Sequence, residues 1–122
     1  MIFRNAIAIC VATFAFAGAS IAGQCGYQKC WGAVAIGPGG AWGAAHSYTS
    51  EQAAANAAQG GCEGDCNNIR TFYNQCGALA EGSNGNWGFG YGGTRDIAEV
   101  NALSACYDYG PNCGIRAYSC SY

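Results

Sequence analysis

Charged side chains are scarce in this sequence, and basic ones are the scarcest. The 122 residues include five Lys or Arg and seven Asp or Glu, for a formal net charge of −2. Nucleic acids and anionic membrane surfaces attract clustered Lys and Arg, and the sequence has no such cluster, so neither is expected as a partner. Long hydrophobic runs are equally rare. The longest, residues 6–17, is too short to cross a bilayer.

The first 22 residues are typical of a secretory signal peptide. Arg4 is the one basic residue, residues 6–17 form the apolar segment, and Ser20-Ile21-Ala22 places small residues before a cleavage site at Gly23. An uncleaved membrane anchor is the alternative. No cysteine directly follows the small residues, so a lipid anchor is not expected. The chain is predicted to be exported, either to the periplasm or out of the cell, with no membrane span after cleavage.

An internal repeat organises the rest of the chain. Trp42–Thr49 returns in altered form as Trp87–Thr94, 45 residues later, and residues 32–57 match residues 77–102 at 11 of 26 positions. Composition alone would give roughly two or three matches, so the chain contains two related units. Residues 23–122 are predicted to form one domain with repeats at about 31–75 and 76–120.

Each repeat predicts a ββαβ unit. A glycine-rich turn joins two strands, and a helix capped by Thr49 or Thr94 follows before a third strand. The predicted strands are residues 33–36, 42–48, 69–73, 78–81, 87–91 and 115–119. The expected fold class is α+β: a small disulfide-rich domain built from a duplicated ββαβ unit, with an antiparallel sheet and two short helices.

Cysteine is abundant for a chain of this size. Apart from Cys10 in the predicted signal peptide, the cysteines form an even set of eight: Cys25, Cys30, Cys62, Cys66, Cys76, Cys106, Cys113 and Cys120. In an exported chain we expect four disulfides and no free thiol. The repeat suggests that Cys62 pairs with Cys66 and that Cys106 pairs with Cys113. A zinc site is not expected, because Cys62 and Cys66 have no second close cysteine pair to join.

The second strand of each repeat has one face of large and one face of small side chains. Trp87, Phe89 and Tyr91 alternate with glycines, and Trp42 and His46 occupy the matching face of the first repeat. Either the aromatic face packs beneath the helices, or the helices lie on the glycine face and the aromatic rings point outward. Size complementarity between alanine-rich helices and large rings favours the first arrangement.

The sequence resembles a family of small exported bacterial proteins, domain of unknown function 4189. The resemblance covers about residues 30–120 and is most specific in Cys76-Gly77-Ala78-Leu79-Ala80 and Trp87-Gly88-Phe89-Gly90. It implies export and a compact duplicated α+β domain. It implies no established activity or catalytic residues.

No convergent catalytic set is evident. His46 is the only histidine, and Ser47 is expected on the opposite strand face, so a hydrolase centred on His46 is the least favoured hypothesis. Acids such as Glu51 and Asp96 occupy first-turn helix positions, where the helix dipole favours a carboxylate. Arg70 and Arg116 are related by the repeat and could bind an anion, although a solvated strand face is the plainer interpretation. We predict no enzyme activity, cofactor or metal.

Two binding hypotheses remain. In the first, the domain binds an extracytoplasmic protein, as an inhibitor or immunity-type blocker, through its hairpin tips. The tip residues proposed as contacts are Pro38, Ser83, Asn84 and Asn86. In the alternative, the domain binds cell-wall glycan through an aromatic face. That face would consist of Trp42, Trp87, Phe89 and Tyr91.

Overall fold

The computed structural model describes residues 22–122, so the predicted signal peptide lies outside the described residues except for Ala22. The elements are β1 (Trp31–Ile36), the short 3-10 helix η1 (Pro38–Gly40), β2 (Trp42–Tyr48), α1 (Glu51–Gly61), β3 (Asn68–Tyr73), β4 (Gln75–Glu81), β5 (Trp87–Gly92), α2 (Arg95–Tyr107) and β6 (Gly114–Ser121). Neither described α-helix has the length and apolar character needed to cross a membrane.

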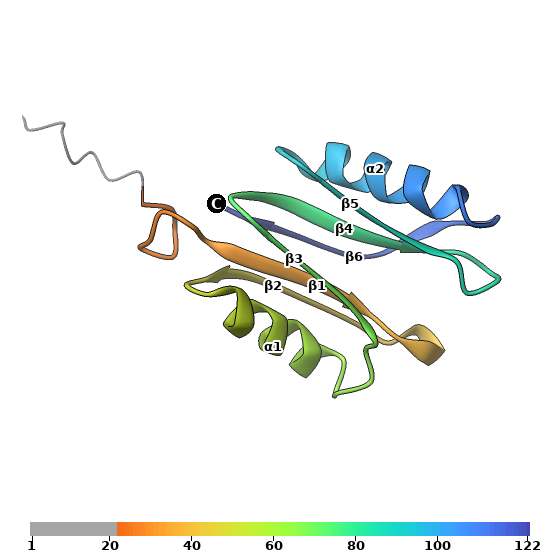
Figure 1. Cartoon of the computed structure of the whole chain (residues 1–122), viewed down its shortest axis with the longest axis horizontal. Coiled ribbons are helices and arrows are strands. Elements are labelled where there is room, and N and C mark those ends of the chain that lie inside the picture. Colours follow the sequence, from red (N-terminus) through yellow and green to blue (C-terminus); the bar gives the residue numbers. More distant parts are fainter. Residues whose placement is uncertain (1–21) are drawn as a thin grey trace, which may run out of the picture.

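The order β-β-α-β occurs twice, and each copy forms its own antiparallel sheet. β1 lies between β2 and β3 in the first sheet, and β4 lies between β5 and β6 in the second. The two sheets face each other, with α1 and α2 on their outer faces, so the domain has four layers (Figure 1). The predicted fold class with its duplicated ββαβ unit is confirmed, with one antiparallel sheet in each unit.

Each helix lies on the glycine face of its sheet. A Cβ added to Gly90 would clash with the backbone of Ala102, and one added to Gly43 would clash with the carbonyl oxygen of Ala58. The helices therefore approach more closely than side chains on these strands would allow. The favoured prediction, with the aromatic face beneath the helices, is wrong. The prediction compared the side-chain sizes of each sheet only with those of the helix in the same unit, whereas the large side chains of β5 face the other sheet.

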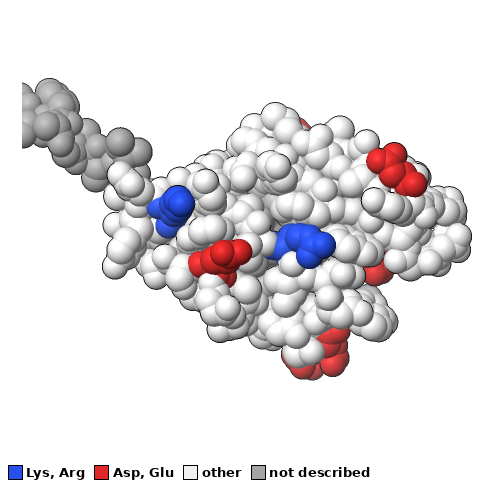
Figure 2. Space-filling view, viewed as in Figure 1, with Lys and Arg blue, Asp and Glu red and all other residues white. Residues whose placement is uncertain are grey.

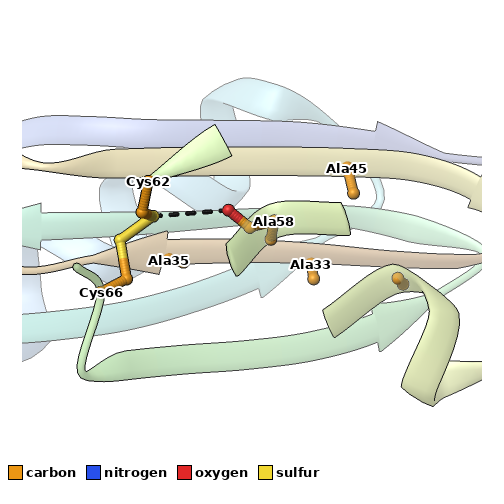
Figure 3. Packing of buried hydrophobic residues seen from close by; sticks show 7 residues of the cluster. Ala33, Ala35, Ala45, Ala58, Cys62 and Cys66 are labelled. Carbon is orange, nitrogen blue, oxygen red and sulfur yellow. Dashed lines mark hydrogen bonds between the residues drawn. A yellow bond between two sulfur atoms is a disulfide. The ribbon is translucent and has the colours of Figure 1, made fainter. Parts of the chain in front are cut away.

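Alanine forms the helix surfaces that meet the sheets. Ala54 and Ala58 of α1 are fully buried, as are Ala98 and Ala102 of α2. The cluster beneath α1 consists of Ala33, Ala35, Ala45, Ala54, Ala58, Cys62 and Cys66 (Figure 3). The Cys62–Cys66 disulfide closes one end of this cluster. Small side chains on both surfaces are what permit the short distance between helix and sheet.

Larger apolar side chains fill the space between the two sheets. This layer consists of Val34, Ile36, Phe72, Leu79 and Ala117, with Ala44, Trp87 and Phe89 partly buried against it. The Phe72 ring lies where a Cβ on Gly32 or Gly77 would stand, so these two glycines make room for it. The ring therefore lies between the middle strands of the two sheets, β1 and β4.

Hydrogen bonds join the two sheets along the β2 and β6 edge. Ser119 Oγ donates to the carbonyl oxygen of Ala45 at 2.8 Å, and Ser121 Oγ accepts from the backbone N–H of Ser47 at 2.9 Å. Both serines are buried, so water competes little with these bonds. This edge of the sandwich is therefore closed.

A bulge in β2 displaces the start of α1 from the predicted position. The register between β1 and β2 shifts near Ser47, which has a φ of 64°. One extra residue thus precedes α1, and Ser50 rather than Thr49 is the N-cap. β5 pairs with β4 without such a shift, and Thr94 caps α2 as predicted.

Four disulfides are present in the described residues. They join Cys25 to Cys30, Cys62 to Cys66, Cys76 to Cys120 and Cys106 to Cys113. The two pairings suggested by the repeat are among them. Cys76 and Cys120 are directly opposite each other on β4 and β6, so this bond links the first and last strands of the second unit.

Gly90→Ala is expected to lower the free energy of unfolding by about 1–3 kcal/mol, because the new methyl group would push α2 away from its sheet. Urea unfolding followed by tryptophan fluorescence measures the change. The matched control is Gly114→Ala, where an added Cβ meets no atom within 4 Å. It should change stability by less than about 0.5 kcal/mol. Equal effects would contradict the close helix packing.

Replacing Cys76 and Cys120 together by serine is expected to cost roughly 4 kcal/mol of unfolding free energy, because that bond closes the longest loop. Its sequence separation is 44 residues, against 5 for Cys25 and Cys30. Replacing Cys25 and Cys30 by serine should cost roughly 2 kcal/mol of unfolding free energy, because that disulfide closes a shorter loop. Chemical denaturation of both double variants tests the ranking, and the reverse order would refute it.

Candidate ligand-binding groove

The edge of the sandwich formed by β3 and β5 is open. At the opposite edge β2 packs on β6, whereas β3 contacts β4 and makes no comparable contact with β5 within residues 22–122. Phe72 stands between the sheets on the β3 side and is almost fully buried. The duplicated units therefore meet tightly along one edge and diverge along the other.

Two adjoining clefts lie along this open edge. The first, of about 640 Å³, is lined by residues that include Arg70, Asn84, Trp87, Phe89 and Tyr109. The second, of about 540 Å³, is lined by residues that include Trp31, Glu51, Thr71, Tyr73, Phe89 and Tyr91. Because Phe89 lines both clefts, they form one continuous surface, which we call the β3–β5 groove.

Aromatic rings follow the length of the groove. On β5, Trp87 and Phe89 are partly buried against the core, and Tyr91 is 57% exposed. The Phe89 and Tyr91 ring centroids lie 5.6 Å apart. Across the second cleft, Trp31 and Tyr73 pair with centroids 5.0 Å apart. Trp31 packs against the cluster beneath α1, so this pair lies on the α1 side of the first sheet and borders the cleft at the edge of β3. The rings of Trp87 and Phe89 face the space between the sheets instead.

Few charged groups interrupt these rings. Arg70 places its guanidinium carbon 4.8 Å from the centroid of the Trp87 ring. In the second cleft, Glu51 accepts a hydrogen bond of 2.7 Å from Thr71 Oγ1. Charged side chains are also sparse on the face of the molecule shown in Figure 2. The groove therefore suits a ligand that presents mostly uncharged surface.

The aromatic residues predicted as one platform are divided by the fold. Trp87, Phe89 and Tyr91 line the groove, whereas Trp42 starts β2 on the other edge of the sandwich. Trp42 is 55% exposed and borders a separate cleft of about 290 Å³ near the end of α1. The rings of β5 point neither toward α2 nor fully into solvent. They face the first sheet along its β3 edge.

The predicted hairpin-tip residues also differ from one another. Pro38, Ser83 and Asn84 are exposed, and both tips lie at the end of the molecule far from the C-terminus (Figure 1). Asn86 is buried instead, and its Nδ2 lies 3.3 Å from the carbonyl oxygens of Cys106 and Pro111. Asn86 therefore joins the turn to the end of α2, and its side chain does not present the free contact surface that the sequence suggested.

His46 pairs with its neighbour in sequence. The bulge in β2 brings Ser47 Oγ within 3.0 Å of His46 Nδ1, although strict strand alternation had placed them on opposite faces. Within the described chain, no carboxylate forms an ion pair with His46.

Elsewhere on the surface, a hydrogen bond with Glu99 raises the pKa of Arg95 above its ordinary value. Among residues 22–122, no group of three or more potential metal ligands gathers.

Several groove residues escaped the sequence analysis. Trp31 and Tyr73 occupy the opposed positions of β1 and β3, and the corresponding positions of the second unit hold the disulfide-bonded Cys76 and Cys120. In the repeat alignment Trp31 corresponds to Cys76. A tryptophan at a position that holds a cysteine in the other unit was the signal that could have marked Trp31. Tyr109 follows α2 in a loop that has no equivalent aromatic residue in the first unit, so the repeat gave no indication of its position.

Comparison with known proteins agrees with the fold. Residues 31–120 match the family described as "Domain of unknown function (DUF4189)". The chain belongs to this family. It is also similar to the NMR structure of Rv1813c from Mycobacterium tuberculosis, with 30% sequence identity, a TM-score of 0.57, and coverage of 75% of this chain and 74% of that chain. Comparison with the curated proteins gave no match. The family resemblance suggested by the sequence motifs is thus confirmed. The groove is the structural feature on which a proposal of function can rest.

Proposed function

We propose that this DUF4189 domain is an exported, non-enzymatic binding module that holds an extended glycan chain in the β3–β5 groove. The observation that carries the proposal is that aromatic rings from both units line two adjoining clefts at the open edge of the sandwich. A sugar ring has an apolar C–H surface that packs on aromatic rings, and its hydroxyl groups need a few well-placed polar partners. Trp87, Phe89 and Tyr91 supply the aromatic rings. Asn84, Thr71 and Gln75, which also line the clefts, supply the polar partners.

The length of the groove supports a chain rather than a single small molecule. β5 has six residues, and six strand residues extend about 20 Å. Each cleft is lined by residues of both units, Arg70 and Trp87 in the first cleft and Tyr73 and Tyr91 in the second. An extended polymer can occupy both clefts, whereas a compact ligand would occupy one cleft.

The disulfides support export. Disulfides persist in oxidising compartments and are rare in the reducing cytosol. Four disulfides in a domain of this size, together with the signal-like start of the chain, support a protein that acts outside the cytoplasm.

The groove chemistry supports binding without hydrolysis. Glycosidases use two carboxyl groups about 5–10 Å apart across the scissile bond. Glu51 is the one carboxylate among the residues that line the two described clefts. It already accepts a hydrogen bond from Thr71.

A second candidate function is inhibition of an extracytoplasmic protein through the hairpin tips. The observation in its favour is that Pro38 and Ser83–Asn84 are exposed at the same end of the molecule (Figure 1). The tips contain no aromatic or arginine anchor, which is the type of residue that dominates most protein interfaces. The groove is therefore the stronger site.

Co-sedimentation with purified peptidoglycan sacculi tests the proposal. The domain should bind, and Tyr91→Ala should weaken binding roughly three- to tenfold, the effect of losing about 0.7–1.4 kcal/mol of ring contact. The matched control is Tyr107→Ala. Tyr107 is 56% exposed, against 57% for Tyr91, and does not line either cleft.

Two results would decide against the glycan proposal. Equal losses in the Tyr91 and Tyr107 variants would show that the groove is not the site. Absence of sacculus binding, together with capture of a protein partner that is lost on Pro38 and Asn84 substitution, would favour the inhibitor hypothesis instead.

A further inference from the structure

We propose that Arg70 binds a carboxylate carried by the glycan, so that the first cleft selects an acidic sugar. This inference rests on the proposed function and names the ligand chemistry of the same groove. Arg70 lies on β3 opposite Val34, a residue of the layer between the sheets, and therefore faces the second sheet. Its guanidinium borders the cleft of about 640 Å³.

Arg70 lacks the carboxylate partner that two other arginines have. In the described chain, Arg95 pairs with Glu99 at 2.6 Å, and Arg116 pairs with Glu81 at 3.7 Å. No ion pair to a carboxylate is present for Arg70 in residues 22–122, and no Asp or Glu is among the residues that line its cleft. An isolated cation beside an otherwise uncharged cleft is complementary to a ligand with a negative group at that point.

The surroundings of Arg70 leave its donors available. Nη1 donates one hydrogen bond of 3.0 Å to the carbonyl oxygen of Ile69. The guanidinium carbon is 4.8 Å from the Trp87 ring centroid, and contact with a ring face leaves the N–H groups at the guanidinium edge free. A guanidinium edge matches a carboxylate through two parallel hydrogen bonds, which a lysine cannot reproduce. Arg70 can therefore supply a bidentate contact while Trp87 holds its orientation.

The second cleft should disfavour a carboxylate. Glu51 lines that cleft and would repel a second negative group placed near it. A glycan in which acidic sugars alternate with neutral ones can place its carboxylate at Arg70 and a neutral sugar near Glu51. A chain with a carboxylate on every sugar cannot avoid Glu51. We therefore expect wall glycan strands without their stem peptides, which carry a free lactyl carboxylate on every second sugar, to bind better than a polyuronate.

Isothermal titration calorimetry with three probes tests this assignment. The probes are the neutral hexamer of N-acetylglucosamine, amidase-treated peptidoglycan strands with free lactyl carboxylates, and hexagalacturonate. The unmodified domain should bind the peptidoglycan strands at least tenfold more tightly than the neutral hexamer. Arg70→Gln should abolish this preference for the acidic strands over the neutral hexamer, and Arg70→Lys should retain part of it.

Arg116→Gln is the matched control, because Arg116 occupies the related strand of the second unit but already pairs with Glu81. The control should preserve the preference for the acidic strands. Unfolding curves of all variants separate a binding defect from loss of the fold.

The outcomes distinguish this inference from the proposed function. Equal binding of neutral and acidic chains, or a preference that survives Arg70→Gln, would overturn carboxylate recognition while leaving groove binding intact. No binding of any glycan would overturn both. Tighter binding of hexagalacturonate than of peptidoglycan strands, if lost in Arg70→Gln, would support Arg70 but assign the carboxylate to a uronate and overturn the role of Glu51.

Discussion

The close approach of each helix backbone to a glycine-bearing strand is the constraint on which the rest of the structure depends. Gly43, Gly88 and Gly90 leave no room for a side chain beneath α1 or α2. Because successive strand residues point to opposite faces, every large ring on β5 must then face the other sheet. The aromatic character of the groove follows from this packing. With its large side chains beneath α2 instead, β5 would have left no rings to line the groove.

The two repeat units differ at the positions where their sheets meet. Phe72 and Ser119 occupy corresponding register positions, opposite Gly32 and Gly77 of the two middle strands. The phenyl ring fills the space between the sheets near β3, whereas the serine hydroxyl forms a hydrogen bond across to β2. One edge is thereby held together and the other is kept apart. Duplication provided the symmetric frame, and this pair of unequal residues, together with the hydrogen bond between Ser47 and Ser121, distinguishes the closed edge from the groove edge.

The sequence predicted those features that depend on short-range pattern. The ββαβ order and the Thr94 cap follow from the spacing of nearby residues, and two disulfide pairings follow from the 45-residue repeat. The sequence did not predict which face of β2 and β5 lies beneath the helix. Matching side-chain volumes cannot reveal whether aromatic rings pack against a helix or against a second sheet. The groove could not be predicted either, since Arg70 and Trp87 come from different units. The bulge at Ser47 left no gap in the alignment of residues 32–57 with 77–102, so it was not predicted, and it shifted the α1 cap to Ser50.

The central claim is that ligand contacts lie along β3 and β5 rather than at the hairpin tips. A titration of the ¹⁵N-labelled domain, residues 23–122, with amidase-treated peptidoglycan strands, followed by backbone amide and tryptophan indole signals, tests it most directly. The account predicts that the largest shifts occur at Arg70, Trp87, Phe89 and Tyr91 and that Trp42 is unaffected. Shifts confined to Pro38–Gly40 and Ser83–Gly85, or no shift at any residue, would contradict it.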